Sequence, residues 1–184
     1  MSKKLKFLAM MLTCILLSIN QVWADYSYTF TEKVFSANGT NVATTLGTVS
    51  WNYTSSQSVT SGKDPYWGYD ATKGQQWGSK NAQASVTLST TGISGTITSV
   101  TVNASVANDG SGTLSVSVGG TDYKSGNNTS VSLTTTATAY TFTSTSSSSG
   151  TIVITLNSST KKSIYMKSIS VVASSGSSYT LVFF

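Results

Sequence analysis

Few residues of this chain could carry out acid–base or nucleophilic chemistry. Its 184 residues contain no His, so neither a Ser-His-Asp nor a Cys-His system can be built. All eleven basic residues are Lys, and without Arg the bidentate recognition of phosphate by side chains is absent as well. A glycosidase needs two carboxylates across a cleft. The closest acids in sequence, Asp64 and Asp70, stand in turn-like contexts near Pro and Gly, and we expect no catalytic residues and no enzyme activity.

Aromatic residues gather in one stretch of 27 residues. The part from Gly62 to Asp70 lacks a clean alternation and predicts a long ordered loop, a place where binding residues tend to lie. Aromatic faces stack on the C–H surfaces of sugars as they do on bases. We therefore predict a ligand-binding set of Tyr66, Trp67, Tyr69, Asp64 and Asp70.

The same stretch also has a structural interpretation. Trp51 and Tyr53 share parity on a predicted strand, so they and Trp77 are expected in the core, as is common for β-sandwiches. For Tyr66, Trp67 and Tyr69, core packing and ligand contact both stay open. The polar side chains that could orient a hydroxylated ligand are Lys63, Lys73, Gln75, Gln76 and Asn81.

No cofactor is predicted, although calcium stays open. Asn108-Asp109-Gly110-Ser111-Gly112 is superficially like a calcium loop but lacks the further carboxylates and the terminal Glu of such loops. It is expected to be a hairpin turn. A structural calcium held by Asp25 or Glu32 together with backbone carbonyls is the alternative that the sequence leaves open.

The elements that must position these residues are short strands. Apolar residues alternate with Ser, Thr or Asn in runs such as 100–106, 114–118, 140–143 and 152–156, which is typical of half-buried antiparallel strands. Turn signals separate the runs: Asn38-Gly39, Asn108-Asp109-Gly110, Gly119-Gly120, Ser125-Gly126-Asn127-Asn128 and Ser149-Gly150. We therefore predict an all-β, antiparallel β-sandwich of the jelly-roll type.

One predicted strand near the end of the chain changes parity. Ile164 and Met166 have one parity, whereas Ile169 and Val171 have the other. A β-bulge around Lys167-Ser168 would place both pairs on the same face. Without a bulge, the inward face would start from Tyr165 and Lys167 would have to snorkel.

The N-terminus resembles an export signal. Lys3, Lys4 and Lys6 precede an apolar run that ends at Leu17, and Val22-Trp23-Ala24 offers a small-residue cleavage site. We predict a helical signal peptide at 1–24, whose apolar run of about eleven residues is too short to span a bilayer, or less favourably a lipoprotein signal at Cys14. Cleavage would leave eight Lys against six acids, so the basic balance does not argue for nucleic acid as a partner.

The predicted mature chain comprises one domain and a short tail. The β-sandwich is expected at 25–173, a flexible Ser/Gly linker at 174–178, and an apolar hexamer at 179–184. That hexamer is either a last edge strand or the start of a domain that this sequence lacks. We expect a secreted, periplasmic or cell-surface protein with no membrane span after signal cleavage.

Several segments together resemble the jelly-roll module of bacterial secreted multidomain proteins, which is similar to carbohydrate-binding and galactose-binding-like domains. They are 69–79, 95–102, 114–120, 150–154 and 164–171. The resemblance covers about 26–173 and implies neighbouring domains in a longer protein, with no catalytic residues. The function expected from these observations is a secreted, non-catalytic module that binds glycan or another extracellular polymer. The alternative is a structural or spacer module with no small ligand.

Overall fold

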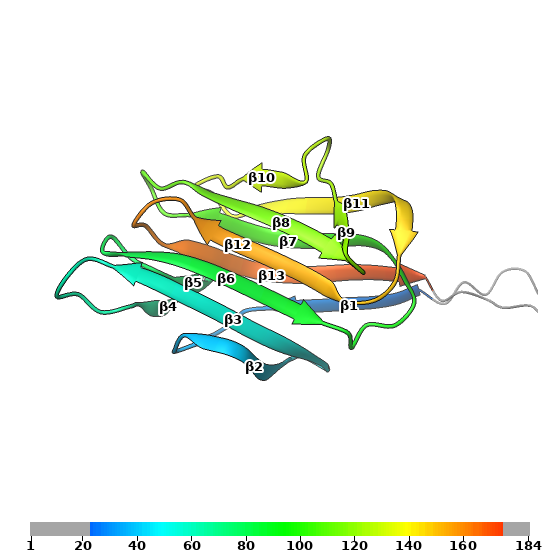
Figure 1. Cartoon of the computed structure of the whole chain (residues 1–184), viewed down its shortest axis with the longest axis horizontal. Helices are drawn as coiled ribbons and strands as arrows, with labels where there is room; N and C mark the ends of the chain where they lie inside the picture. Colours follow the sequence, from blue (N-terminus) through cyan, green and yellow to red (C-terminus); the bar gives the residue numbers. More distant parts are fainter. Residues whose placement is uncertain (1–22, 175–184) are drawn as a thin grey trace, which may run out of the picture.

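The computed structural model describes residues 23–174, which contain thirteen strands and no helix. All strand pairs are antiparallel, and the strands form two sheets that pack face to face (Figure 1). The six-stranded sheet has the order β11 (Thr138–Ser148), β7 (Thr96–Val106), β13 (Ile164–Ser174), β5 (Gly74–Trp77) and β4 (Trp67–Asp70), with β1 (Trp23–Thr29) also paired to β13.

The seven-stranded sheet covers the first one. Its order is β10 (Ser130–Ser132), β8 (Gly112–Val118), β12 (Ile152–Ser158), β6 (Ala82–Thr90), β3 (Val49–Val59) and β2 (Gly39–Leu46), with β9 (Thr121–Tyr123) also paired to β8. The predicted antiparallel β-sandwich is therefore confirmed, and the arrangement is compatible with a jelly roll.

The core between the sheets follows from the alternation in the sequence. In β12, Ile152, Ile154 and Leu156 are buried, while the residues between them are half-buried on the outer face. The strands β6 and β8 show the same period of two. Because successive side chains of a strand point to opposite faces, each sheet turns its apolar row inward and its Ser, Thr and Asn row outward.

The predicted bulge in β13 is confirmed. The register against β7 shifts between Met166 and Ser168, and the buried positions change from even to odd numbers across Lys167. Gly74 packs against this bulge with a φ of 88°, and a Cβ at that position would lie 2.2 Å from the Met166 carbonyl oxygen. Only glycine fits a backbone that is both left-handed and this close to a neighbour.

Four of the five predicted turns lie between strands. The turn at 108–110 joins β7 to β8, and Asp109 has a φ of 59°; the signals at 119–120, 125–128 and 149–150 also separate consecutive strands. Asn38-Gly39 does not lie wholly between strands, because β2 begins at Gly39. That dipeptide instead ends the strap (residues 31–38), which connects β1 in one sheet to β2 in the other.

Most of the predicted signal peptide, linker and tail lies outside the described residues. The exceptions are Trp23 and Ala24, whose backbone pairs with Ser174 and Ala173 at the start of β1, and Ser174, which is the last residue of β13. Cleavage after Ala24 stays a prediction. Within residues 23–174 there is no apolar helix that could cross a membrane.

Candidate ligand-binding surfaces

The predicted binding loop is only partly a loop. Residues 60–66 connect β3 to β4, but Trp67–Asp70 form the strand β4 at the edge of the six-stranded sheet, so the prediction of an irregular segment up to Asp70 was wrong. The strand is four residues long and contains Gly68, too short and too irregular for its alternation to be recognised in the sequence.

Pairing with β5 decides which way the aromatic side chains of β4 point. Trp67 pairs with Trp77, and Tyr69 pairs with Gln75. Trp77 and Gln75 are completely buried, and directly paired residues lie on the same face of a sheet. Trp67 and Tyr69 are therefore on the inner-face side of an edge strand, where Trp67 packs against the core and Tyr69 remains 37% exposed.

Three predicted core aromatics are confirmed as core. Trp51, Tyr53 and Trp77 are at most 3% exposed. The Trp77 indole N–H donates to the Tyr53 hydroxyl over 3.0 Å, and that of Trp51 donates to the Tyr26 hydroxyl over 3.1 Å. Burial raises the pKa of Tyr26 to about 12 and also raises the pKa of Tyr53. The buried aromatic side chains are thus held by hydrogen bonds as well as by packing.

The two carboxylates of the predicted ligand set, Asp64 and Asp70, lie in different surroundings. One Asp70 oxygen accepts three hydrogen bonds, from the Thr72 hydroxyl (2.6 Å), the Thr72 amide (2.8 Å) and the Lys73 amide (2.9 Å). These bonds, with that of the Thr72 hydroxyl first, lower the pKa of Asp70. Asp70 is therefore a charged turn residue of the β4–β5 hairpin, whereas Asp64 is exposed in the loop before β4.

Gln75 was wrong as a ligand contact because its side chain is completely buried. Its carbonyl oxygen accepts from the amides of Val34 (2.7 Å) and Phe35 (3.0 Å), and its amide nitrogen donates to the carbonyls of Phe35 (3.1 Å) and Gly68 (3.2 Å). Phe35 also stacks on Tyr53, with ring centroids 4.0 Å apart. Gln75 thus holds the strap to the six-stranded sheet, and Phe35 holds it to the seven-stranded sheet.

Tyr66 lies on the outer face of the six-stranded sheet, away from Trp67 and Tyr69. Its ring fills the space beside Gly68, where an added Cβ would be 2.9 Å from the ring, and it remains 46% exposed. Gly68 pairs with Gln76, and Gln76 pairs with Tyr165 of β13. Together Tyr66, Gln76 and Tyr165 form a row across three strands, called here the tyrosine row.

Polar groups of the tyrosine row have fixed orientations. The Gln76 amide nitrogen donates to the Ser163 hydroxyl over 2.8 Å, which leaves its carbonyl oxygen beside Tyr66. The Lys73 ammonium lies 5.1 Å from the centre of the Tyr165 ring, within the range of a cation–π contact. The sequence gives no signal that Tyr165 belongs to this row, because it is 99 positions from Tyr66.

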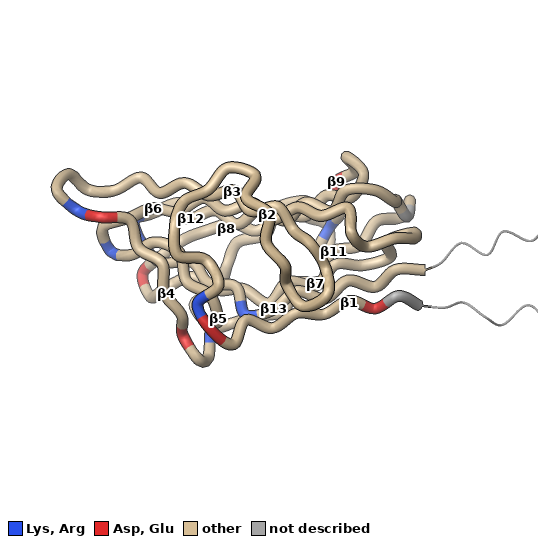
Figure 2. The backbone as a smooth tube through the Cα atoms, turned by 90° about the horizontal axis from the view of Figure 1, so that it is seen from below, with Lys and Arg blue, Asp and Glu red and all other residues tan. Residues whose placement is uncertain are grey.

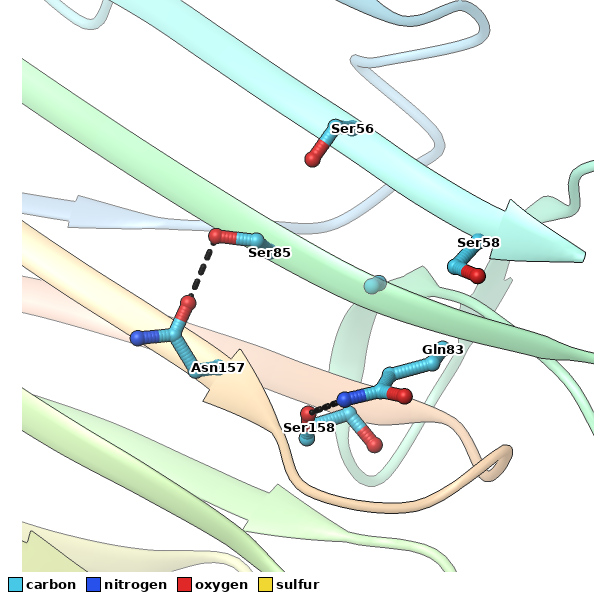
Figure 3. A pocket seen from close by; sticks show the side chains of 7 residues that line it. Ser56, Ser58, Gln83, Ser85, Asn157 and Ser158 are labelled. Carbon is cyan, nitrogen blue, oxygen red and sulfur yellow. Dashed lines mark hydrogen bonds between the residues drawn. The ribbon is translucent and has the colours of Figure 1, made fainter.

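A hollow lies on the outer face of the other sheet (Figure 3). It has a volume of about 290 Å³ and is called here the serine groove. Its side chains come from neighbouring strands β3, β6 and β12, and apart from Ala84 they are all uncharged hydrogen-bonding groups: Ser56, Ser58, Gln83, Ser85, Asn157 and Ser158. The charged residues lie mainly in loops and near strand ends, so the middle of the sheets is almost free of charge (Figure 2).

No candidate metal centre emerges from the part of the chain that the structure describes. Within residues 23–174 no three His, Cys, Asp or Glu side chains come together. The loop around Asp109 is a turn, but the prediction of a hairpin was wrong, because it joins β7 in one sheet to β8 in the other. A structural calcium at Asp25 or Glu32 therefore gains no support from a cluster of acids.

Comparison with known proteins finds neither a protein family that matches this chain nor a curated protein significantly similar to it. The chain is thus established as an antiparallel two-sheet β-sandwich, compatible with a jelly roll.

Proposed function

We propose that this protein is a secreted, non-catalytic binding module for glycan or another hydroxylated extracellular polymer, and that the polymer lies along the tyrosine row. The observation that carries the proposal is the placement of Tyr66 and Tyr165 on either side of Gln76, on one outer face of the sandwich. This differs from the predicted ligand set, of which the proposal keeps only Tyr66.

The spacing of the row suits an extended chain of sugar rings. Gly68, Gln76 and Tyr165 occupy three adjacent strands, so the ring beside Gly68 and the Tyr165 position are about 10 Å apart, two strand spacings. Each ring can stack on the C–H face of one sugar. The Gln76 carbonyl oxygen between them accepts from a sugar hydroxyl, and the Lys73 ammonium donates to one.

The available chemistry favours binding over turnover. The sequence has no His, and the carboxylate of Asp70, in the turn between β4 and β5, is held charged by its turn hydrogen bonds. A general acid needs the opposite, a raised pKa. The row therefore supplies contact area and hydrogen bonds without a group suited to proton transfer.

The proposal can be tested with the purified protein on a glycan array, followed by affinity electrophoresis in gels that contain each polysaccharide bound on the array. Removal of one stacking ring in Tyr66→Ala or Tyr165→Ala should weaken binding about tenfold, near the lower end of what one stacked ring contributes. The matched control is Tyr69→Ala, which removes a similarly exposed tyrosine from the other side of β4 and should leave affinity within about twofold.

Absence of binding to every arrayed glycan at millimolar concentration would reject the proposal and favour the alternative, a structural or spacer module. Equal losses in Tyr69→Ala and Tyr66→Ala would reject the tyrosine row as the site, because the two rings lie on different sides of the strand.

A further inference from the structure

The serine groove lies on the side of the sandwich opposite the tyrosine row. It crosses three strands in register: Ser56 of β3 faces Ser85 of β6, and Ser85 faces Asn157 of β12. Two residues further along each strand, the next row on this face consists of Thr54, Thr87 and Thr155. The groove therefore opens onto a regular surface of hydroxyl groups rather than onto an isolated gap between loops.

Hydrogen bonds inside the groove fix its two amides. Ser85 donates its hydroxyl to the Asn157 side-chain oxygen over 2.6 Å, so the Asn157 amide nitrogen lies on the side away from Ser85 (Figure 3). The Gln83 amide nitrogen donates to the Ser158 carbonyl over 2.8 Å, which turns the Gln83 oxygen outward (Figure 3). Two amide side chains of fixed orientation thus line the groove together with Ser56 and Ser58.

The groove is also free of charge. The strands that form it, β3, β6 and β12, contain no Lys, Asp or Glu. An anionic ligand would lose hydration there without meeting an opposite charge among the lining side chains, which is costly. The Lys161 ammonium, which donates to the Thr60 hydroxyl over 3.0 Å, is not one of them. A neutral sugar suits the groove, because each of its hydroxyls can accept from the Asn157 amide or donate to the Gln83 oxygen.

We infer that the serine groove is a second binding site, which takes a neutral oligosaccharide or polysaccharide chain, so that one protein molecule holds two chains on opposite faces and cross-links them. The neutral-glycan site rests on the groove alone. The cross-linking also rests on the function proposed for the tyrosine row.

The test uses three neutral polysaccharides as probes, dextran, laminarin and galactomannan, with polygalacturonate as the acidic comparison. Ser56→Tyr fills the groove from an exposed position of β3, and Asn157→Ala removes one of its two amide side chains. The control is Asn52→Tyr, which adds the same ring to an exposed outer-face position of the same strand, outside the groove. Thermal unfolding checks that each variant remains folded, and light scattering reports whether protein and polysaccharide form cross-linked aggregates.

We expect wild type and Asn52→Tyr to bind at least one neutral probe and to cross-link it, as seen in rising light scattering. Ser56→Tyr and Asn157→Ala should bind a neutral probe about tenfold more weakly at the groove and lose cross-linking, while binding at the tyrosine row persists. The double variant Tyr66→Ala/Tyr165→Ala should retain neutral binding at the groove without cross-linking.

The possible failures are distinguishable. Loss of all binding in Tyr66→Ala/Tyr165→Ala, with Ser56→Tyr unchanged, would overturn the groove site and leave the proposed function intact. Loss of all binding in Ser56→Tyr alone would support the groove site but overturn both the cross-linking and the tyrosine row. Stronger binding of polygalacturonate than of the neutral probes at the groove would also overturn the inference.

Discussion

Replacement of Gln75 by Leu should release the strap from the six-stranded sheet. The substitution places an apolar side chain of similar size in a completely buried position. It leaves the backbone amides of Val34 and Phe35 without their acceptor. A buried donor without a partner costs about 1–3 kcal/mol. Phe35 is buried and Val34 only half-buried, so water restores part of the loss at Val34, and we expect a net destabilisation of about 3 kcal/mol.

Urea denaturation followed by tryptophan fluorescence measures this loss, and thermal unfolding should show a decrease in Tm of roughly 6–12 °C for a domain of this size. The matched control is Gln76→Leu. Its side chain is half-buried and its amide donates to one side chain, that of Ser163, besides a longer contact with the Gly78 carbonyl, so it should lose about 1 kcal/mol or less. A Gln75→Leu protein within about 1 kcal/mol of wild type would show that the strap does not depend on these bonds.

Three further comparisons between variants, or between a variant and wild type, test the packing and burial described above. Gly74→Ala should prevent folding or cost well over 3 kcal/mol in urea denaturation, whereas Gly62→Ala, also at positive φ (72°) but with open space around it, should cost about 1 kcal/mol; equal losses would contradict the close approach at the bulge. Tyr26→Phe should lose less stability than wild type as the pH rises from 10 to 12. The folded wild type keeps the Tyr26 hydroxyl proton up to a pKa of about 12, whereas the unfolded chain releases it near 10. Parallel curves of unfolding free energy against pH, measured by chemical denaturation, would contradict this prediction. Trp67→Phe should cost less in thermal unfolding than Trp77→Phe, because the Trp67 indole N–H lies near the Tyr53 hydroxyl but outside normal hydrogen-bond geometry. Trp77→Phe breaks a hydrogen bond of 3.0 Å and should cost about 1–3 kcal/mol; the reverse order would refute this difference.

Features of the fold that depend on local sequence were predictable. The alternation of apolar and hydroxyl residues placed Ile152 and Ile154 inward, and the parity change around Lys167 located the bulge before any pairing was known. Both follow from the period of two along a strand, a property of neighbours in the chain.

Features that depend on pairing between distant strands were not predictable. A buried Gln75 resembles a surface residue in the sequence, because its partners in the strap lie about 40 positions earlier. The aromatic residues of the predicted ligand set are divided between two faces for the same reason. In β4 the inner-face Trp67 is followed by the outer-face Gly68, and the Tyr66 ring lies beside Gly68. Tyr66 therefore lies in one row with Tyr165, a neighbour that only the strand order β4, β5, β13 provides.

The pairing of β1 with β13 places Trp23 beside Ser174, at one end of the sandwich (Figure 1). Tyr165 lies near the other end of β13, a distance of about 30 Å along the strand. A linker attached to either described end would therefore emerge far from the tyrosine row and leave it free to reach outward from its tether. The adjacent ends also make the sandwich a suitable subject for circular permutation, since a short peptide could join them without crossing a binding face.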